Sequence, residues 1–128
     1  MPSFFYLVNT MATDEKRTDQ RVESSNLLSY ICLDENNHEM MQGMGRTLNV
    51  SEGGILLETH VSVSPQYIVS LTIALEDELM DFKGKIAHSR KRADGKFESG
   101  IEFIEMDEEK QVFFNQYILM FRRQQNIT

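Results

Sequence analysis

Apolar and polar side chains alternate along much of the chain between positions 25 and 105, and this alternation predicts β-strands. The clearest run spans residues 67–75, where every second side chain is apolar. The same pattern predicts further strands at residues 25–33, 40–50, 55–59, 82–86 and 97–103. The pair Asp94-Gly95 between the last two is a strong hairpin signal. Six strands separated by turn signals predict an antiparallel sheet, for which the pattern alone fits a barrel or a sandwich.

A helix is predicted after the sheet, over residues 107–124. Asp107 suits its N-cap, and the acidic residues Glu108 and Glu109 favour the positive end of a helix. Apolar side chains cover more than one face, so the helix is expected to bury most of its surface. We expect it to pack on the sheet domain, with a contact to a second copy of the chain in a homodimer as the alternative.

Glycines interrupt the second predicted strand. Gly43 and Gly45 lie within residues 40–50, where they predict a β-bulge or a bend of the sheet.

At 128 residues the chain has the size of one domain, which we place at residues 12–128 after a peripheral segment, 1–11. No apolar run approaches the roughly 20 residues of a membrane helix, so no membrane contact is expected. The single cysteine, Cys32, excludes an internal disulfide and suits a cytoplasmic location. The net charge of −7 argues against general nucleic-acid binding, but a local basic cluster could still bind a small anion.

A polar stretch, Asn49-Val50-Ser51-Glu52-Gly53-Gly54, lies between two apolar runs. In an extended segment Asn49 and Ser51 point to the same face, and Val50 points inward. Together the amide and the hydroxyl offer donors and acceptors to one flat polar partner. Gly53 and Gly54 permit a tight turn or the close approach of a ligand. Taken alone, the stretch also fits an ordinary polar β-turn.

Residues 12–24 lack apolar periodicity and predict a polar arm, which carries Lys16, Arg17 and Arg21. The spacing of four places both arginines on one side of a helix or a strand. Guanidinium groups bind phosphate in a bidentate manner and also recognise the O6/N7 edge of guanine.

The motifs Arg17-x-x-x-Arg21 and Asn49-x-Ser51-x-x-Gly54 together resemble the two signatures of the PilZ domain family, cytoplasmic bacterial receptors for cyclic di-GMP. The resemblance runs from about residue 16 to about residue 104. It implies an all-β fold, a six-stranded antiparallel PilZ-type β-barrel over residues 25–105 with a C-terminal helix. It also implies that cyclic di-GMP is bound by Arg17, Arg21, Asn49 and Ser51, with Gly54 allowing the turn.

Four further residues are candidates for ligand contacts. In the family, the residue before the first arginine influences whether one nucleotide or a stacked pair binds, and the cationic Lys16 favours the pair. Gly53 adjoins the motif. Arg90 and Arg92, predicted on one strand face, are additional candidates, with solvated hairpin charge as the alternative.

No set of residues in the sequence supports catalysis. The three histidines lack zinc-site spacing, and Ser51 is not in a nucleophile elbow, so we expect no enzyme activity, metal or cofactor. The resemblance implies that ligand binding orders the arm over the barrel and relays a signal to an unidentified protein partner, in the regulation of motility or biofilm formation. The alternative is a ligand-independent interaction module in motility or secretion assemblies.

Overall fold

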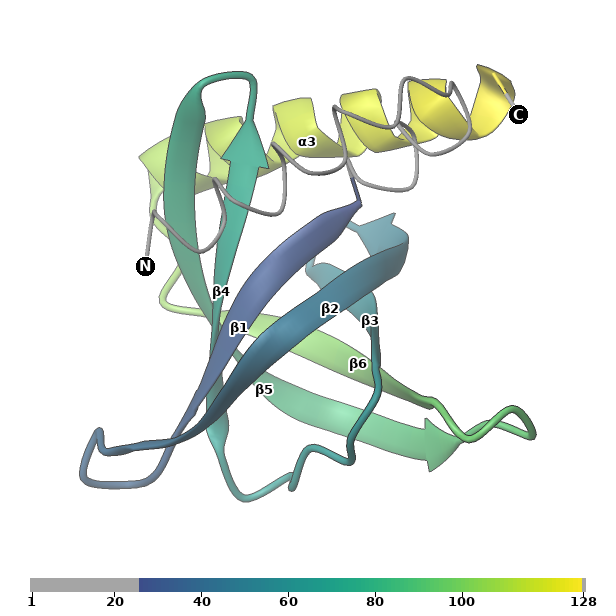
Figure 1. Cartoon of the computed structure of the whole chain (residues 1–128). Helices are drawn as coiled ribbons and strands as arrows, with labels where there is room; N and C mark the ends of the chain where they lie inside the picture. The colour runs from purple at the N-terminus through teal and green to yellow at the C-terminus, as the bar shows by residue number, and fades with distance from the viewer. Residues whose placement is uncertain (1–25, 128) are drawn as a thin grey trace.

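The computed structural model describes residues 26–127, and all six predicted strands are present in this range. All pair antiparallel, and they close into a barrel in the order β1-β2-β3-β6-β5-β4, so the predicted barrel is confirmed (Figure 1). The peripheral segment 1–11 and the arm 12–24, with Lys16, Arg17 and Arg21, lie outside the described residues. The elements are β1 (Leu27–Leu33), β2 (Glu39–Ser51), β3 (Gly54–Thr59), β4 (Ile68–Leu75), β5 (Glu78–Lys91), β6 (Phe97–Ile104) and the helix α3 (Glu108–Ile127).

The interior of the barrel is built from the alternating apolar positions. In β4, Val69, Leu71 and Ile73 are buried, while the residues between them are partly exposed. In β5, Phe82 and Ile86 point inward in the same way. Removal of this apolar surface from water is the main stabilising contribution to the fold.

Helix α3 lies across one end of the barrel (Figure 1). The Oδ1 atom of Asp107 accepts a hydrogen bond from the backbone N–H of Lys110 at 2.8 Å, which confirms the predicted N-cap. Phe114 on the helix is fully buried and meets Phe103 of β6 edge to face, with 4.7 Å between ring centroids. The predicted packing of the helix on the barrel is therefore confirmed.

The helix does not bury every apolar side chain. Val112 and Leu119 remain 53% and 60% exposed, so the expected burial of most of the helix surface does not include these two side chains. The reason is geometric, because the barrel contacts only one side of α3. Within residues 26–127, no helix combines the length and apolarity that a membrane crossing needs.

The glycines of β2 have a different role from the expected one. The pairing with β1 continues without a shift through Gly43 and Gly45. A Cβ at Gly43 would come within 3.0 Å of the Tyr30 hydroxyl oxygen, and one at Gly45 within 2.8 Å of Leu57 Cδ1. These glycines therefore make room for large side chains, and no bulge occurs between β1 and β2 at their positions.

The β5–β6 turn has the predicted hairpin form. Gly95 has a φ of 92°, which a residue with a side chain rarely adopts. The backbone N–H of Arg92 donates to the carbonyl of Lys96 at 2.8 Å and closes the turn. Arg92 itself lies just beyond β5, which ends at Lys91.

Candidate ligand-binding site

A β-bulge in β2 decides which of its side chains face outward. The pairing with β3 shifts between Thr47 and Asn49, which leaves Leu48 as the extra residue. Thr47 is 2% exposed, whereas Asn49 is exposed. Residues two apart in a regular strand point to the same face, so the bulge is what turns Asn49 outward. Beyond it, Val50 is buried and Ser51 is exposed, as the sequence predicted.

A second bulge has the same effect in β5. The pairing with β6 shifts between Ile86 and His88, with Ala87 as the extra residue. Ile86 is part of the core, whereas His88 is exposed. The two bulges therefore place an amide and an imidazole on the outer face of one four-strand surface, made by β2, β3, β6 and β5.

Strand pairing aligns these two side chains in one row across the four strands. Asn49 on β2 pairs with Leu56 on β3, which pairs with Gly100 on β6. Gly100 pairs in turn with His88 on β5. The row thus has polar side chains at its ends, and its middle, Leu56 and Gly100, is apolar.

This row lines a pocket of about 330 Å³ on the outside of the barrel. Its volume lies at the lower end of the range for small-molecule sites, roughly 300–1,000 Å³. From the motif stretch the lining includes Asn49, Ser51, Gly53 and Gly54. From the strands opposite it includes Ala87, His88, Gly100, Ile101 and Glu102. The motif residues within the described range are thereby brought together.

The polar groups of the motif keep hydrogen-bonding capacity for a ligand. The Oδ1 atom of Asn49 accepts a hydrogen bond from the backbone N–H of Val50 at 2.9 Å, which leaves the two donors of its amide nitrogen outside that bond. The hydroxyl of Ser51 donates to the carbonyl of Gly54 at 3.4 Å. This is long for an O–H···O hydrogen bond, so the Ser51 hydroxyl is held only weakly.

Gly54 is required because β3 and β6 approach closely. A Cβ at Gly54 would collide with the backbone carbonyl of Ile101. Gly54 is not among the glycines of positive φ, so its conformation in the turn does not itself demand glycine. Next to it, the carbonyl of Gly53 accepts a hydrogen bond from the N–H of Phe103 at 2.8 Å, and this bond fastens the turn to β6.

His88 is a pocket residue that the sequence pattern did not reveal. It pairs with Gly100, and a Cβ at Gly100 would come within 2.8 Å of ring carbons of His88. The imidazole therefore leans across Gly100 in space that only glycine leaves open. No spacing signal in the sequence could have indicated this, because the outward direction of His88 depends on the bulge at Ala87.

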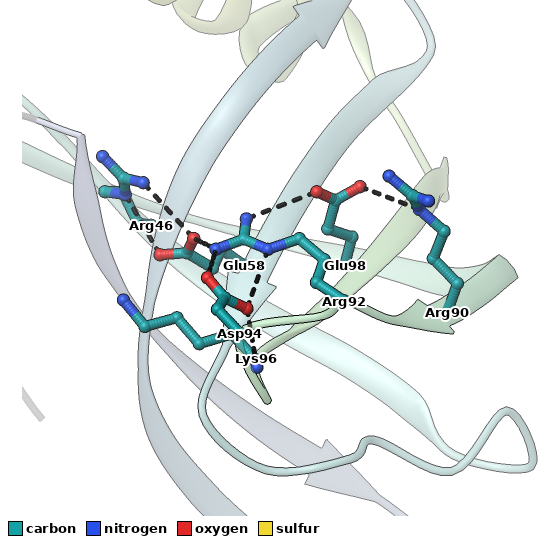
Figure 2. Close-up of polar contacts among 7 residues, drawn as sticks. All are labelled: Arg46, Glu58, Arg90, Arg92, Asp94, Lys96 and Glu98. Atoms are coloured by element: carbon teal, nitrogen blue, oxygen red, sulfur yellow. Dashed lines mark hydrogen bonds and ion pairs between the residues drawn. The ribbon is translucent and has the colours of Figure 1, made fainter.

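Ion pairs occupy the next row of the same outer surface (Figure 2). Arg46 on β2 donates to Glu58 on β3, with 3.1 Å between Nε and Oε1. On the other side of the surface, Arg90 on β5 donates to Glu98 on β6, with 3.3 Å between Nε and Oε1. Glu58 and Glu98 pair with each other across β3 and β6, which places both ion pairs in one row.

Arg92 connects the two halves of this row. Its Nη2 atom lies 2.7 Å from Glu58 Oε2 and 2.6 Å from Asp94 Oδ2, and its Nη1 atom lies 3.3 Å from Glu98 Oε2. Figure 2 shows the guanidinium group reaching all three carboxylates. We define these residues, with Arg46 and Arg90, as the arginine–carboxylate network.

The network lowers the pKa of two of its carboxyl groups, those of Glu58 and Asp94. Burial opposes ionisation of Glu58, but hydrogen bonds and positive charge from Arg46 and Arg92 outweigh it and hold its pKa below the ordinary value. Hydrogen bonds from Arg92 and from the N–H of Lys96 lower the pKa of Asp94 to about 2. Glu58 and Asp94 are therefore ionised at neutral pH. Arg90 and Arg92 lie in the network rather than among the pocket-lining residues.

Comparison with known proteins agrees with this architecture. The family model described as PilZ domain matches residues 15–119. The fold is similar to the crystal structure of the PilZ domain of CeSA from a cellulose-synthesizing bacterium, with a TM-score of 0.51 and 11% identity over 75% of this chain and 93% of that one. It is also similar to MrkH of K. pneumonia in its apo state, with a TM-score of 0.54 and 13% identity over 77% of this chain and 48% of MrkH.

No curated protein is significantly similar to this chain. At 11% and 13% identity, the two solved structures support the fold alone. The family match rests on different ground, because it covers residues 15–119, well over half of the 128 residues, and includes both sequence motifs. The chain therefore belongs to the PilZ domain family.

Proposed function

We propose that this chain is a receptor for cyclic di-GMP, which it binds between the outer-face pocket and the arm of residues 12–24. Membership of the PilZ family supports the choice of ligand, since the family consists in general of receptors for this dinucleotide. The observation that carries the proposal is the position of Asn49, Ser51 and Gly54 in the lining of one pocket.

In this proposal each motif residue has a distinct part. Asn49 and Ser51 hydrogen-bond the nucleotide from the pocket side, using the amide and hydroxyl groups that the β2 bulge turns outward. Arg17 and Arg21 approach from the arm and bind phosphate oxygens and the O6/N7 edge of guanine. Gly53 allows the ligand to approach the backbone closely, because no other atom lies within 4 Å of the place that a Cβ would take there.

Charged contacts are sufficient to account for useful affinity. A hydrogen bond to a charged group contributes roughly 1.5–3 kcal/mol. Two arginines and two polar side chains together reach the roughly −8 kcal/mol that corresponds to micromolar binding. Lys16 adds a further cation beside them and favours a stacked pair of nucleotides over one.

The other two arginine candidates have a weaker case as ligand contacts. Arg92 already donates to three carboxylates, and Arg90 pairs with one of these, Glu98. A phosphate group would have to compete with those partners. We therefore assign Arg92 mainly to holding the β5–β6 turn, and expect Arg17 and Arg21 to dominate binding.

The biological output in this proposal is a signal passed to a partner protein. Ligand binding orders the arm over the pocket and changes the surface that a cytoplasmic partner contacts. The competing function is a ligand-independent interaction module. The exposed apolar side chains Val112 and Leu119 on α3 favour that second function, because such residues suit protein contacts.

Calorimetric titration of the purified chain with cyclic di-GMP tests the proposal, with cyclic di-AMP as the matched control. We expect binding in the micromolar range for cyclic di-GMP, a rise in melting temperature with saturation, and much weaker binding of the adenine compound. Absence of both heat and a thermal shift would reject the receptor function and leave the interaction module.

A further inference from the structure

The pocket has a floor that the two motifs do not include. Its middle is formed by Leu56 and Gly100, which pair across β3 and β6, and its far end by the imidazole of His88. All three residues line the pocket. None of them belongs to the Arg17–Arg21 motif or to the Asn49–Gly54 motif. The two motifs therefore do not explain what these three residues contribute to binding.

We propose that His88 is a base-stacking residue, and that Leu56, Gly100 and the His88 imidazole together form a platform for one guanine base. This inference rests on the proposed function and adds the position of the base within the site.

The geometry favours a planar ligand. A Cβ at Gly100 would lie within 2.8 Å of ring carbons of His88, so the ring lies against the β6 backbone instead of standing away from it. An imidazole held in this way offers a ring face to a base, and Leu56, which pairs with Gly100, lines the same pocket. Unpaired bases bind to such aromatic surfaces by stacking, which depends on the face of the base.

The position of Asn49 completes the subsite. Asn49 lies at the opposite end of the same row, so a base on the platform would present an edge to its amide while its face rests on His88. Stacking supplies affinity for any base, and the amide contact supplies orientation. The bulge at Ala87 is what makes this arrangement possible, because it turns His88 outward.

Substitution of His88 separates stacking from other roles. We expect His88→Ala to weaken cyclic di-GMP binding about tenfold, within the range found for loss of one stacked base. His88→Phe should restore binding, because it keeps a flat ring, and His88→Gln should not. His60→Ala is the matched control, since His60 is also exposed but lies outside the pocket lining. Circular dichroism of each variant checks that the fold is retained.

Two further measurements test the geometry. In Gly100→Ala the new methyl group must displace the imidazole, so binding should weaken although His88 is still present. In the wild-type protein, the ring-proton NMR signals of His88 should shift upfield on ligand binding, while those of His60 should not.

Unchanged affinity of His88→Ala would overturn the stacking role while leaving the receptor function intact. Rescue by Gln and not by Phe would also overturn it, in favour of a hydrogen bond from the side chain. If the wild-type chain failed to bind cyclic di-GMP, both the receptor function and this inference would fall.

Discussion

The hydroxyl of Tyr117 on α3 lies 2.9 Å from the hydroxyl of Thr47 on β2, and both side chains are buried. Thr47 is also the residue at which the bulge before Asn49 begins. One buried hydrogen bond therefore joins the helix that closes the barrel to the strand that carries the motif. Burial raises the pKa of Tyr117 to about 12, so its hydroxyl stays protonated at neutral pH.

Loss of either hydroxyl should destabilise the fold. Tyr117→Phe leaves the buried Thr47 hydroxyl without this partner, and we expect a loss of about 1–3 kcal/mol in the free energy of unfolding. Thr47→Val should cost a similar amount. The double variant should lose clearly less than the sum, because no polar group of the pair is then left unsatisfied. Urea unfolding measures all three, and strictly additive losses would show that the hydroxyls do not interact.

The two glycines of the β2–β3 turn should respond differently to the same substitution. Gly54→Ala forces a methyl group against the Ile101 carbonyl, and we expect a loss of about 1–3 kcal/mol or more, as for other overpacked sites. Gly53→Ala is the matched control, because no atom lies within 4 Å of its Cβ position. Chemical denaturation compares the two variants. Equal stability of both would mean that β3 and β6 do not approach as closely as described.

Arg92 should control how the stability of the fold depends on pH. The folded-state pKa of Asp94 is about 2, below its ordinary value of 3.8, and that of Glu58 is also lowered. Carboxyls with depressed pKa values stabilise the fold at pH above their ordinary values, and this contribution is lost as the pH falls towards 2. We expect the wild-type protein to lose stability between about pH 4.5 and 2 for this reason.

Arg92→Ala should lower stability at neutral pH and make the loss below pH 4.5 shallower. The slope should not vanish, because the backbone N–H groups that bond Asp34 lower the pKa of that carboxyl independently. Arg90→Ala is the control, since Arg90 is 70% exposed and contacts Glu98 alone among the network acids, so its effect should be small. Thermal melts at a series of pH values measure both variants, and identical slopes in Arg92→Ala and wild type would contradict the account.

The arm arginines should matter for binding and not for folding. We expect Arg17→Ala or Arg21→Ala to weaken cyclic di-GMP binding at least about tenfold, because loss of one charged contact exceeds the roughly 1.4 kcal/mol of a decade. Within residues 26–127 the core is formed by buried apolar side chains, most of them on the strands and α3, so we expect melting temperatures without ligand to stay close to wild type. Calorimetry with each variant gives the affinities, and an unchanged dissociation constant would remove the arm from the binding site.

Much of the fold follows from local sequence signals. The alternation in residues 67–75 predicted β4, Asp94-Gly95 predicted the last hairpin, and Asp107 predicted the start of α3; each of these is confirmed. These elements were predictable because a period of two, a positive φ and an N-cap each impose a residue type at a fixed place.

The pocket was less predictable, because it depends on where alternation is interrupted. The glycines Gly43 and Gly45 predicted a bulge or a bend, whereas the register shifts occur at Leu48, at Ala87 and between Cys32 and Leu33. The side chains of Leu48 and Ala87 give no such signal. The outward direction of His88 follows from that second bulge. Gly100 lies opposite His88 and leaves room for its ring, but this follows only from the pairing of β5 with β6.

The most direct test of the account is an NMR titration of the isotopically labelled chain with cyclic di-GMP. We predict that the largest backbone amide shifts fall on two regions, the arm around Arg17 and Arg21, and the pocket from Asn49 to Ile55 together with His88 and Gly100. Shifts confined to α3 around Val112 and Leu119, or no shifts at saturating ligand, would contradict the claim that arm and pocket bind the dinucleotide from two sides.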